Sequence, residues 1–120
     1  MKTILVAEDN DSNYILMTYI LKRNYEFRRA KNGQEAVEEV DKGGIDLVLM
    51  DLKMPVMDGL EATKHIKEKH PDLPIIALTA NAFDSDRKLA MEAGCNAFLP
   101  KPVSSDLCLK TIAKFFEEGE

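Results

Sequence analysis

The chain has 120 residues, of which 45% are hydrophobic and 31% are charged, and its formal net charge is -5. This length and composition predict one soluble globular domain over residues 1–120, with a single core. The apolar runs are only as long as strands, so we expect no membrane span, no membrane contact and no signal peptide, and a cytoplasmic location. The negative charge disfavours direct binding to nucleic acid, which requires clustered lysine and arginine.

The first predicted element is a strand at residues 2–7, an apolar run that ends in the acidic segment 8–11. A helix is predicted over residues 12–24, because apolar residues recur there at helical spacing and form one buried stripe. The residues of this stripe are Leu16, Met17, Ile20 and Leu21. Ile15 and Tyr19 fall outside it, so they are either half-buried packing or an exposed surface that docks a partner helix.

The next two elements are a short strand at residues 27–30 and a helix that ends near residues 43–44. Asn32 followed three residues later by Glu35 is the pattern of a helix N-cap, which places the start of this helix. A strand followed by a helix has now occurred twice.

The central predicted strand is residues 47–50, four apolar residues that run directly into Asp51. Unbroken apolar runs are typical of parallel strands covered on both faces, so Asp51 is expected at the carboxyl end of a buried strand. Residues 53–57 form a loop, since Pro55 disfavours helical backbone before it. A helix follows over residues 59–69, capped by Asp58 together with Glu61.

The last predicted elements are a strand at residues 74–79, a helix at 84–93, a strand at 97–99 and a final helix. The first of these strands ends in a hydroxyl, Thr79, and the second is followed by Lys101. The buried stripe of the final helix is predicted to contain Leu109, Ile112 and Phe116.

Strict alternation of strands and helices predicts an α/β fold, a flavodoxin-like (βα)5 doubly wound five-stranded parallel sheet with strand order 2-1-3-4-5. In this order the first and third strands are neighbours at the switch point of the sheet. Glu8, Asp9 and Asp51 then share one crevice, and Thr79 and Lys101 border it from the fourth and fifth strands.

The residue types in this crevice suit phosphoryl transfer. Three adjacent carboxylates resist ionising without a cation, and oxygen ligands alone favour a hard ion, here Mg²⁺. The ammonium of Lys101 and the hydroxyl of Thr79 are groups that position and neutralise a phosphoryl group. Asp51 is then the nucleophile, and the product is an acyl phosphate.

The whole chain resembles a receiver domain of two-component signalling, closest to the receivers of hybrid sensor kinases. The residues that carry the resemblance are Glu8-Asp9, Asp51, residues 54–59, Thr79-Ala80 and residues 98–102. The resemblance implies that Asp51 accepts phosphate from a histidine kinase or a histidine phosphotransfer domain. It also implies that Asp9, Asp51 and the backbone carbonyl of Lys53 hold Mg²⁺, and that Glu8 acts largely through bound water.

The resemblance further implies that Lys101 contacts the phosphoryl group, that the Lys101-Pro102 bond is cis, and that a switch operates. Thr79 would move towards the phosphate, Phe98 would rotate into the vacated space, and the surface formed by residues 84–93, 97–99 and the last helix would change. The expected state is a monomer or a weak dimer, either a stand-alone response regulator or part of a hybrid kinase. Lys53 and Asn81 flank the path of an attacking water and would affect the lifetime of the phosphate.

Three other functions remain open from the sequence. An aspartyl-nucleophile phosphatase would need a second acid two residues after Asp51, where this chain has Lys53. A flavodoxin-like cofactor binder would need a phosphate-binding loop after the first strand, where this chain has acidic residues. The third alternative is a receiver that acts as a scaffold without being phosphorylated. The leading prediction is a signalling domain, not an enzyme that acts on an external substrate.

Overall fold

The computed structural model describes residues 1–80 and 84–118. Within these residues the chain alternates five strands with five helices. The strands are β1 (Thr3–Ala7), β2 (Glu26–Ala30), β3 (Leu47–Asp51), β4 (Ile75–Thr79) and β5 (Ala97–Pro100). The helices are α1 (Asp11–Leu21), α2 (Gly33–Asp41), α3 (Gly59–Lys69), α4 (Asp84–Ala93) and α5 (Ser105–Glu118). Every strand and helix expected from the sequence is present.

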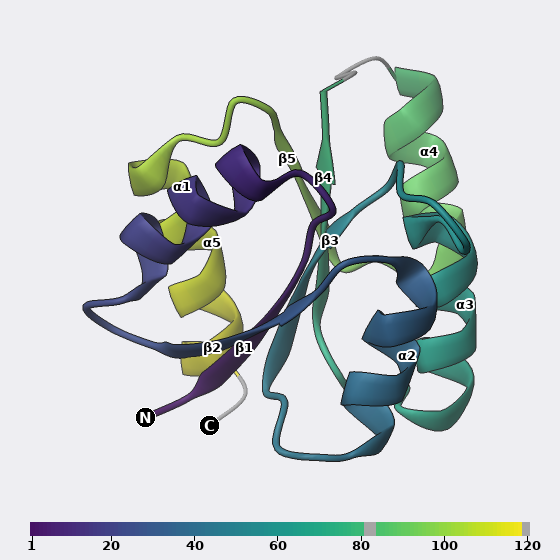
Figure 1. Cartoon of the computed structure of the whole chain (residues 1–120), viewed down its shortest axis with the longest axis horizontal. Helices are drawn as coiled ribbons and strands as arrows, with labels where there is room; N and C mark the ends of the chain where they lie inside the picture. The colour runs from purple at the N-terminus through teal and green to yellow at the C-terminus, as the bar shows by residue number, and fades with distance from the viewer. Residues whose placement is uncertain (81–83, 119–120) are drawn as a thin grey trace.

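The strands form one parallel sheet with the order β2-β1-β3-β4-β5, which confirms the predicted fold class and strand order. In the register of the sheet, Ala7 lies opposite Met50, and Thr79 lies opposite Pro100. The carboxyl ends of the strands therefore meet along one edge, which is the upper edge in Figure 1, opposite the N-terminus. This edge collects the polar residues that follow each strand.

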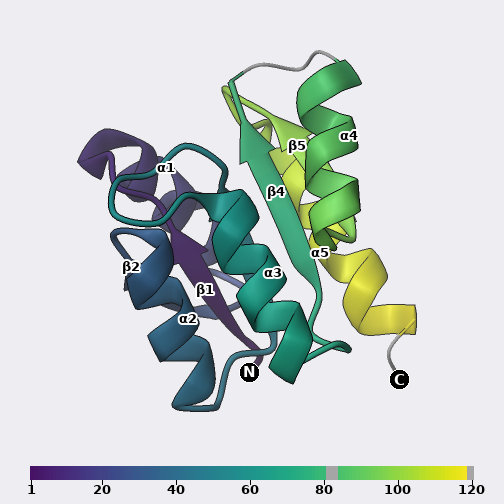
Figure 2. The same ribbon diagram turned by 90° about the vertical axis from the view of Figure 1, so that its right-hand side faces the viewer.

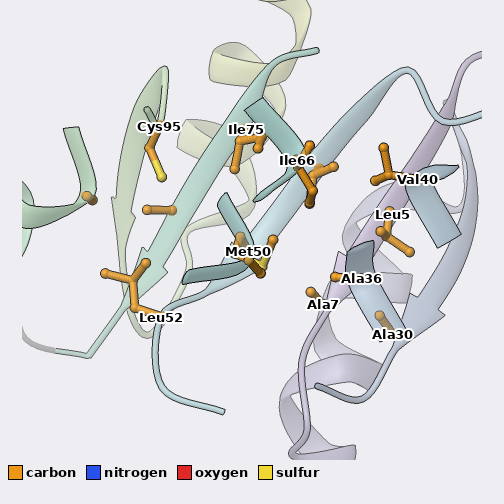
Figure 3. Packing of buried hydrophobic residues seen from close by; sticks show 14 residues of the cluster. Leu5, Ala7, Ala30, Ala36, Val40, Met50, Leu52, Ile66, Ile75 and Cys95 are labelled. Atoms are coloured by element: carbon orange, nitrogen blue, oxygen red, sulfur yellow. The ribbon is translucent and has the colours of Figure 1, made fainter. Parts of the chain in front are cut away.

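Helices cover both faces of the sheet, with α1 and α5 on one face and α2, α3 and α4 on the other (Figures 1 and 2). Successive side chains of a strand point to opposite faces, so an unbroken apolar strand serves two cores. Ile4 and Val6 of β1 pack in the core under α1 and α5, whereas Leu5 packs in the core under α2, α3 and α4. Figure 3 shows Leu5 in this second core together with Val40 of α2 and Ile66 of α3.

Side-chain caps confirm the predicted starts of α2 and α3, and α1, for which no cap was predicted, has one as well. Asn10 accepts a hydrogen bond from the backbone N–H of Asn13, Asn32 from that of Glu35, and Asp58 from that of Glu61. Caps of this kind satisfy backbone donors that the first turn of a helix leaves without a partner. They fix where α1, α2 and α3 leave the carboxyl edge of the sheet.

Two details of the predicted helices are wrong. Helix α1 ends at Leu21, three residues earlier than expected, because the chain must turn there to enter β2. Leu16, predicted to be buried, is 42% exposed. Met17, Ile20 and Leu21 already fill the space over the sheet, so Leu16 stays on the flank of the helix.

The predicted stripe of α5 is only partly buried. Ile112 is fully buried, together with Cys108, which the stripe did not include. Leu109 and Phe116 are half-buried at the border of the same core. In the described part of the chain no helix is both long enough and apolar enough to cross a membrane.

The loop from β3 to α3 approaches the sheet so closely that only glycine fits at its end. The backbone N–H of Gly59 donates to the carbonyl of Leu52 at 2.9 Å, and a Cβ at position 59 would collide with the carbonyl of Asp51. Within this loop Val56 has a φ of 68°, a left-handed conformation that is unfavourable for a β-branched residue. The conformation of the loop fixes the backbone just after Asp51.

Candidate functional site

Three carboxylates meet at the carboxyl edge of the sheet, as the strand order predicted. Glu8 and Asp9 follow β1, Asp51 ends the neighbouring β3, and one carboxylate oxygen of each lies within 4.8 Å of the others. Glu8 is only 1% exposed and Asp51 only 5%, whereas Asp9 is exposed. Two of the three acidic groups are thus buried beside each other, and the third faces solvent.

The amine of Lys101 lies between the two buried carboxylates. Its Nζ is 2.9 Å from Oε1 of Glu8 and 3.2 Å from Oδ2 of Asp51. Lys101 follows β5 at a Lys101-Pro102 peptide bond that is cis, as the resemblance implied. The side chain therefore reaches across the carboxyl edge of the sheet to β1 and β3.

The ionisation of these groups is shaped by burial and by one another. Burial raises the pKa of Glu8, and although the hydrogen bond from Lys101 opposes this, the nearby Asp51 adds to the rise. Burial lowers the pKa of Lys101, but the hydrogen bond to Glu8 and the charge of Asp51 outweigh it, and the pKa is above its ordinary value. Lys101 is therefore a permanent cation at neutral pH.

A cleft of about 250 Å³ opens above these groups, and Lys53 and Thr79 also line it. The backbone N–H of Lys53 donates to Oδ1 of Asp51 at 3.3 Å, which orients the carboxylate. Thr79 is 3% exposed at the end of β4. The structure thus brings together Glu8, Asp9, Asp51, Lys53, Thr79 and Lys101, the six residues that the sequence singled out for the metal and the phosphoryl group.

The two predicted switch residues lie on adjacent strands. Oγ1 of Thr79 donates to Oδ2 of Asp86 at 3.5 Å, a long contact that joins β4 to α4. Phe98 is half-buried in β5 and alternates with Leu99, which belongs to the core under α1 and α5, so Phe98 points to the face that α4 covers. Asn81, expected beside the path of an attacking water, lies outside the described residues.

Two contacts of the site were missed by the sequence reasoning. Asp86 looks like an ordinary acid in the first turns of a helix, and its contact with Thr79 depends on how α4 lies over β4. Arg29 of β2 donates to the backbone carbonyls of Glu8 and Asp9. Neither residue belongs to a motif, so no signal in the sequence could have identified it.

The donor set fits a hard divalent cation. Its ligand atoms are carboxylate oxygens gathered at one end of a polar cleft, with room on the solvent side for water and for a phosphoryl oxygen. Such a set favours Mg²⁺, which retains water molecules and requires only one or two carboxylates from the protein.

The sequence is similar to receivers of two kinds. It is 42% identical to hybrid signal transduction histidine kinase B of Dictyostelium discoideum, over 95% of this chain but only 7% of that protein. It is 34% identical to the polar-differentiation response regulator DivK of Brucella anthropi, over 98% of each chain. The chain therefore spans a small part of the hybrid kinase and nearly all of the response regulator.

Solved structures with the same fold include receivers from a fungus and a bacterium. A chain of the co-crystal structure of the Saccharomyces cerevisiae histidine phosphotransfer protein Ypd1 with the receiver domain of Ssk1 matches with a TM-score of 0.89 and 34% identity, over 95% of this chain and 88% of that one. The receiver domain of the Pseudomonas aeruginosa sensor histidine kinase PA1611, solved with a magnesium ion coordinated in its active-site cleft, matches with a TM-score of 0.89 and 33% identity, over 95% and 96%.

A sequence model of one family matches residues 4–113, nearly the whole chain. With the strand order, the helices on both faces and the polar carboxyl edge, this match shows that the chain belongs to the response regulator receiver domain family of two-component signalling.

Proposed function

We propose that this chain is a phosphoacceptor domain in which Asp51 receives a phosphoryl group from a phosphohistidine. The observation that carries the proposal is the placement of Asp51 at the base of an open cleft, with the Lys101 amine 3.2 Å from its carboxylate. A carboxylate beside a fixed cation and a hydroxyl-bearing residue has what phosphoryl transfer requires, namely position and neutralisation of charge.

In the proposed reaction an oxygen of Asp51 forms a bond to phosphorus while the bond from phosphorus to the donor histidine nitrogen breaks. The electron pair of that bond returns to the imidazole, so the net change is the movement of one phosphoryl group. Lys101 faces the incoming oxygens, and Thr79 offers a hydroxyl from the next strand. Lys101 then pairs with the phosphoryl group in place of the Asp51 carboxylate.

Glu8, Asp9 and Asp51 are the side chains that would hold Mg²⁺, with the backbone carbonyl of Lys53 as a further ligand. When bound, the ion supplies positive charge that offsets both the clustered carboxylates and the phosphoryl oxygens. The magnesium ion in the cleft of the similar PA1611 receiver supports this assignment. Because Glu8 already pairs with Lys101, we propose that it contacts the ion through bound water, whereas Asp9 and Asp51 bind the ion directly.

Phosphorylation would change the surface formed by α4, β5 and α5. Thr79 is bound to Asp86 of α4, so movement of its hydroxyl towards the phosphate removes a contact of α4 with the sheet. Phe98, which faces the same side from β5, would rotate into the space released. The phosphate shifts this two-state equilibrium only by interacting more favourably with one state than with the other.

The proposed partner is a histidine kinase or a histidine phosphotransfer domain that docks on α1. Ile15 and Tyr19 of α1 are 52% and 64% exposed, and Leu16 of the same helix lines a pocket that reaches Glu8 and Lys101. The match to the co-crystal structure of Ypd1 with a receiver domain supports a histidine phosphotransfer protein as the partner. We further propose that residues 1–120 are one domain, monomeric or weakly dimeric, in the cytoplasm, in a stand-alone regulator or a hybrid kinase.

The test is chemical phosphorylation of the whole chain. Incubation with acetyl phosphate and Mg²⁺ should add one phosphoryl group, measured by intact mass spectrometry, and Asp51→Asn should block the gain. As a matched control, Asp58→Asn changes an exposed acid that caps α3 and should leave the gain intact. An unchanged mass in a wild-type chain that binds Mg²⁺ by calorimetry would contradict the proposal and favour an unphosphorylated scaffold.

The same experiment distinguishes an enzyme from a phosphoacceptor. A phosphatase with an aspartyl nucleophile needs an acid to protonate the leaving group, and the residue at that position is Lys53. We therefore expect one phosphoryl group per chain, lost only by self-hydrolysis. Steady turnover of a phosphomonoester would establish the phosphatase instead.

A further inference from the structure

One arginine from the edge strand holds the acidic loop that follows β1. Nε and Nη2 of Arg29 donate to the backbone carbonyl of Glu8 at 3.2 and 3.1 Å. Nη2 also lies 3.4 Å from the carbonyl of Asp9 and 2.8 Å from Oδ1 of Asp11. A single guanidinium therefore contacts three of the four residues from 8 to 11, which lead from β1 into α1.

Arg29 is itself held in place. Its guanidinium lies over the ring of Tyr14, 4.4 Å from the centroid, and Tyr14 makes an edge contact with Phe27 of β2. The Arg29 side chain is only 18% exposed, and its backbone pairs with Val6 in the register of β1 and β2. Because stacking on Tyr14 fixes the planar guanidinium of Arg29, its hydrogen bonds restrict the conformation of the loop.

The contacts of Arg29 affect the position of two of the three carboxylates of the cleft, those of Glu8 and Asp9. Glu8 and Asp9 lie in the loop between β1 and α1, whereas Asp51 belongs to the central strand β3 and is fixed by the sheet. The positions of the Glu8 and Asp9 side chains depend on the loop backbone, and Arg29 binds the carbonyl of each residue. A cation site made by all three depends on this loop holding its conformation.

We propose that Arg29 is a positioning residue for the divalent-cation site, acting on the ion through the backbone of Glu8 and Asp9. The inference rests on the proposed function and deepens it, because it names a residue outside the cleft that sets the affinity for Mg²⁺. Groups that orient metal ligands typically contribute about 10- to 100-fold to metal affinity. Because Arg29 is itself a cation, its charge cannot attract Mg²⁺, and a contribution to affinity must come from positioning the loop.

Charge and position predict opposite effects of removing Arg29. As a cation near a cation site, Arg29 repels Mg²⁺, so loss of its charge alone would tighten binding. As the group that fixes the loop, it reduces the conformational freedom that the ligands lose on binding, so its loss would weaken binding. The sign of the change in affinity therefore decides between the two roles.

The experiment is calorimetric titration of the whole chain with Mg²⁺, for the wild type and for Arg29→Met, Arg29→Lys and Arg28→Met. Arg28 is the matched control, since it is adjacent in β2 but binds Glu39 and the carbonyl of Gly43, on the other side of the sheet. We expect Arg29→Met to weaken binding about tenfold and Arg29→Lys to recover part of the loss. Arg28→Met should bind like the wild type.

A second measurement needs no metal. Amide hydrogen exchange of residues 8–11 in the metal-free chain should be faster in Arg29→Met than in the wild type and unchanged in Arg28→Met. If Arg29→Met fails to fold, Tyr14→Leu removes the ring beneath the guanidinium and should weaken Mg²⁺ binding about threefold, a smaller loss of ligand orientation than removing Arg29.

The outcomes separate this inference from the proposed function. Equal or tighter Mg²⁺ binding by Arg29→Met would overturn the positioning role and leave the metal site in place. Full recovery by Arg29→Lys would overturn the claim for the fork-shaped guanidinium, since lysine can donate to a loop carbonyl but has no planar fork to bind several acceptors at once. A wild-type chain that binds no Mg²⁺ would instead defeat the metal site, and unchanged exchange in Arg29→Met would then defeat the loop contact as well.

Discussion

Glu8 is a buried carboxylate, and its hydrogen bonds stabilise the charged form less than burial destabilises it. It accepts hydrogen bonds from the Lys101 amine at 2.9 Å and from the backbone N–H of Asn10 at 3.3 Å, yet burial still raises its pKa. The folded chain therefore binds the proton of Glu8 more tightly than the unfolded chain does. By linkage, the contribution of Glu8 to stability is greatest at low pH and falls as pH rises through the raised pKa.

This gives a prediction for Glu8→Gln in metal-free protein. Glutamine keeps the shape but never ionises, so the variant should gain stability relative to the wild type as pH rises from about 4 to about 7. The measurement is the free energy of unfolding in urea with EDTA, for both proteins at both pH values. Subtracting the wild-type free energy of unfolding from that of the variant at each pH removes the contribution of the groups that the two proteins share.

A matched control for this prediction is Glu61→Gln, because Glu61 is an exposed acid on α3 outside the cleft. The effect of the buried position is the pH-dependent gain of Glu8→Gln in excess of that of Glu61→Gln. If the stability of Glu8→Gln relative to the wild type were constant or fell with rising pH, the raised pKa of Glu8 would be wrong.

At the scale of single residues, the sequence identifies functional groups whose place at the end of a strand already determines where they lie. Glu8, Asp51 and Lys101 each directly follow or end an apolar strand, so the strand order alone brings them together. Arg29 and Asp86 could not be found in this way, because their roles depend on the direction of a long side chain and on the tilt of a helix. Such contacts are decided by packing, which the pattern of apolar residues does not encode.

Among the structural elements, the loop between β3 and α3 is constrained at two positions. Its end is pinned where Gly59 contacts the carbonyl of Asp51, and Val56 within it has a φ of 68°. These constraints place the start of α3 directly against the strand that ends in Asp51. Any side chain at position 59 must push the two apart.

We therefore predict that Gly59→Ala destabilises the chain by about 2 kcal/mol, within the range for overpacked sites. It should also weaken Mg²⁺ binding, because the backbone beside Asp51 has to shift. Gly43→Ala is the matched control. Position 43 has open space around it but a φ of 87°, so it should cost only about 1 kcal/mol from the backbone and leave Mg²⁺ binding unchanged.

Urea denaturation and Mg²⁺ calorimetry of the two variants check this prediction. Equal losses of stability, together with equal Mg²⁺ affinities, would show that the close approach at Gly59 does not constrain the site.

At the scale of elements, the caps and the apolar strands were predictable because each depends on neighbours in the sequence. The width of a buried stripe was not, as Leu16 of α1 and Cys108 of α5 show. Which side of a helix is covered depends on how α1 and α5 share one face of the sheet (Figure 1). That division is a property of the tertiary structure.

On the scale of the whole molecule, the site exists only in the folded chain. Its carboxylates lie at the ends of two strands, β1 and β3, that are neighbours in the sheet although more than forty residues separate Glu8 from Asp51 in the sequence. An ion that binds the folded state and not the unfolded state stabilises the fold by mass action, by about 1.4 kcal/mol at ten times its dissociation constant.

Saturating Mg²⁺ should therefore raise the melting temperature by several degrees relative to NaCl of equal ionic strength. Asp9→Asn should remove most of this rise, because it deletes the exposed carboxylate of the cluster, and Asp72→Asn, outside the cleft, should keep it. Differential scanning calorimetry of the three proteins measures the effect. A rise of the same size in Asp9→Asn would contradict the proposed ligand set.

The contact between Lys101 and Glu8 joins positions 93 residues apart. During synthesis on the ribosome, both acidic segments emerge well before the lysine that separates their charges. A nascent chain that stops short of β5 consequently lacks the Lys101 amine that pairs with Glu8 and Asp51. Under the proposed function, uptake of a phosphoryl group therefore depends on a residue made near the end of synthesis, and we expect products that stop before it to be inactive.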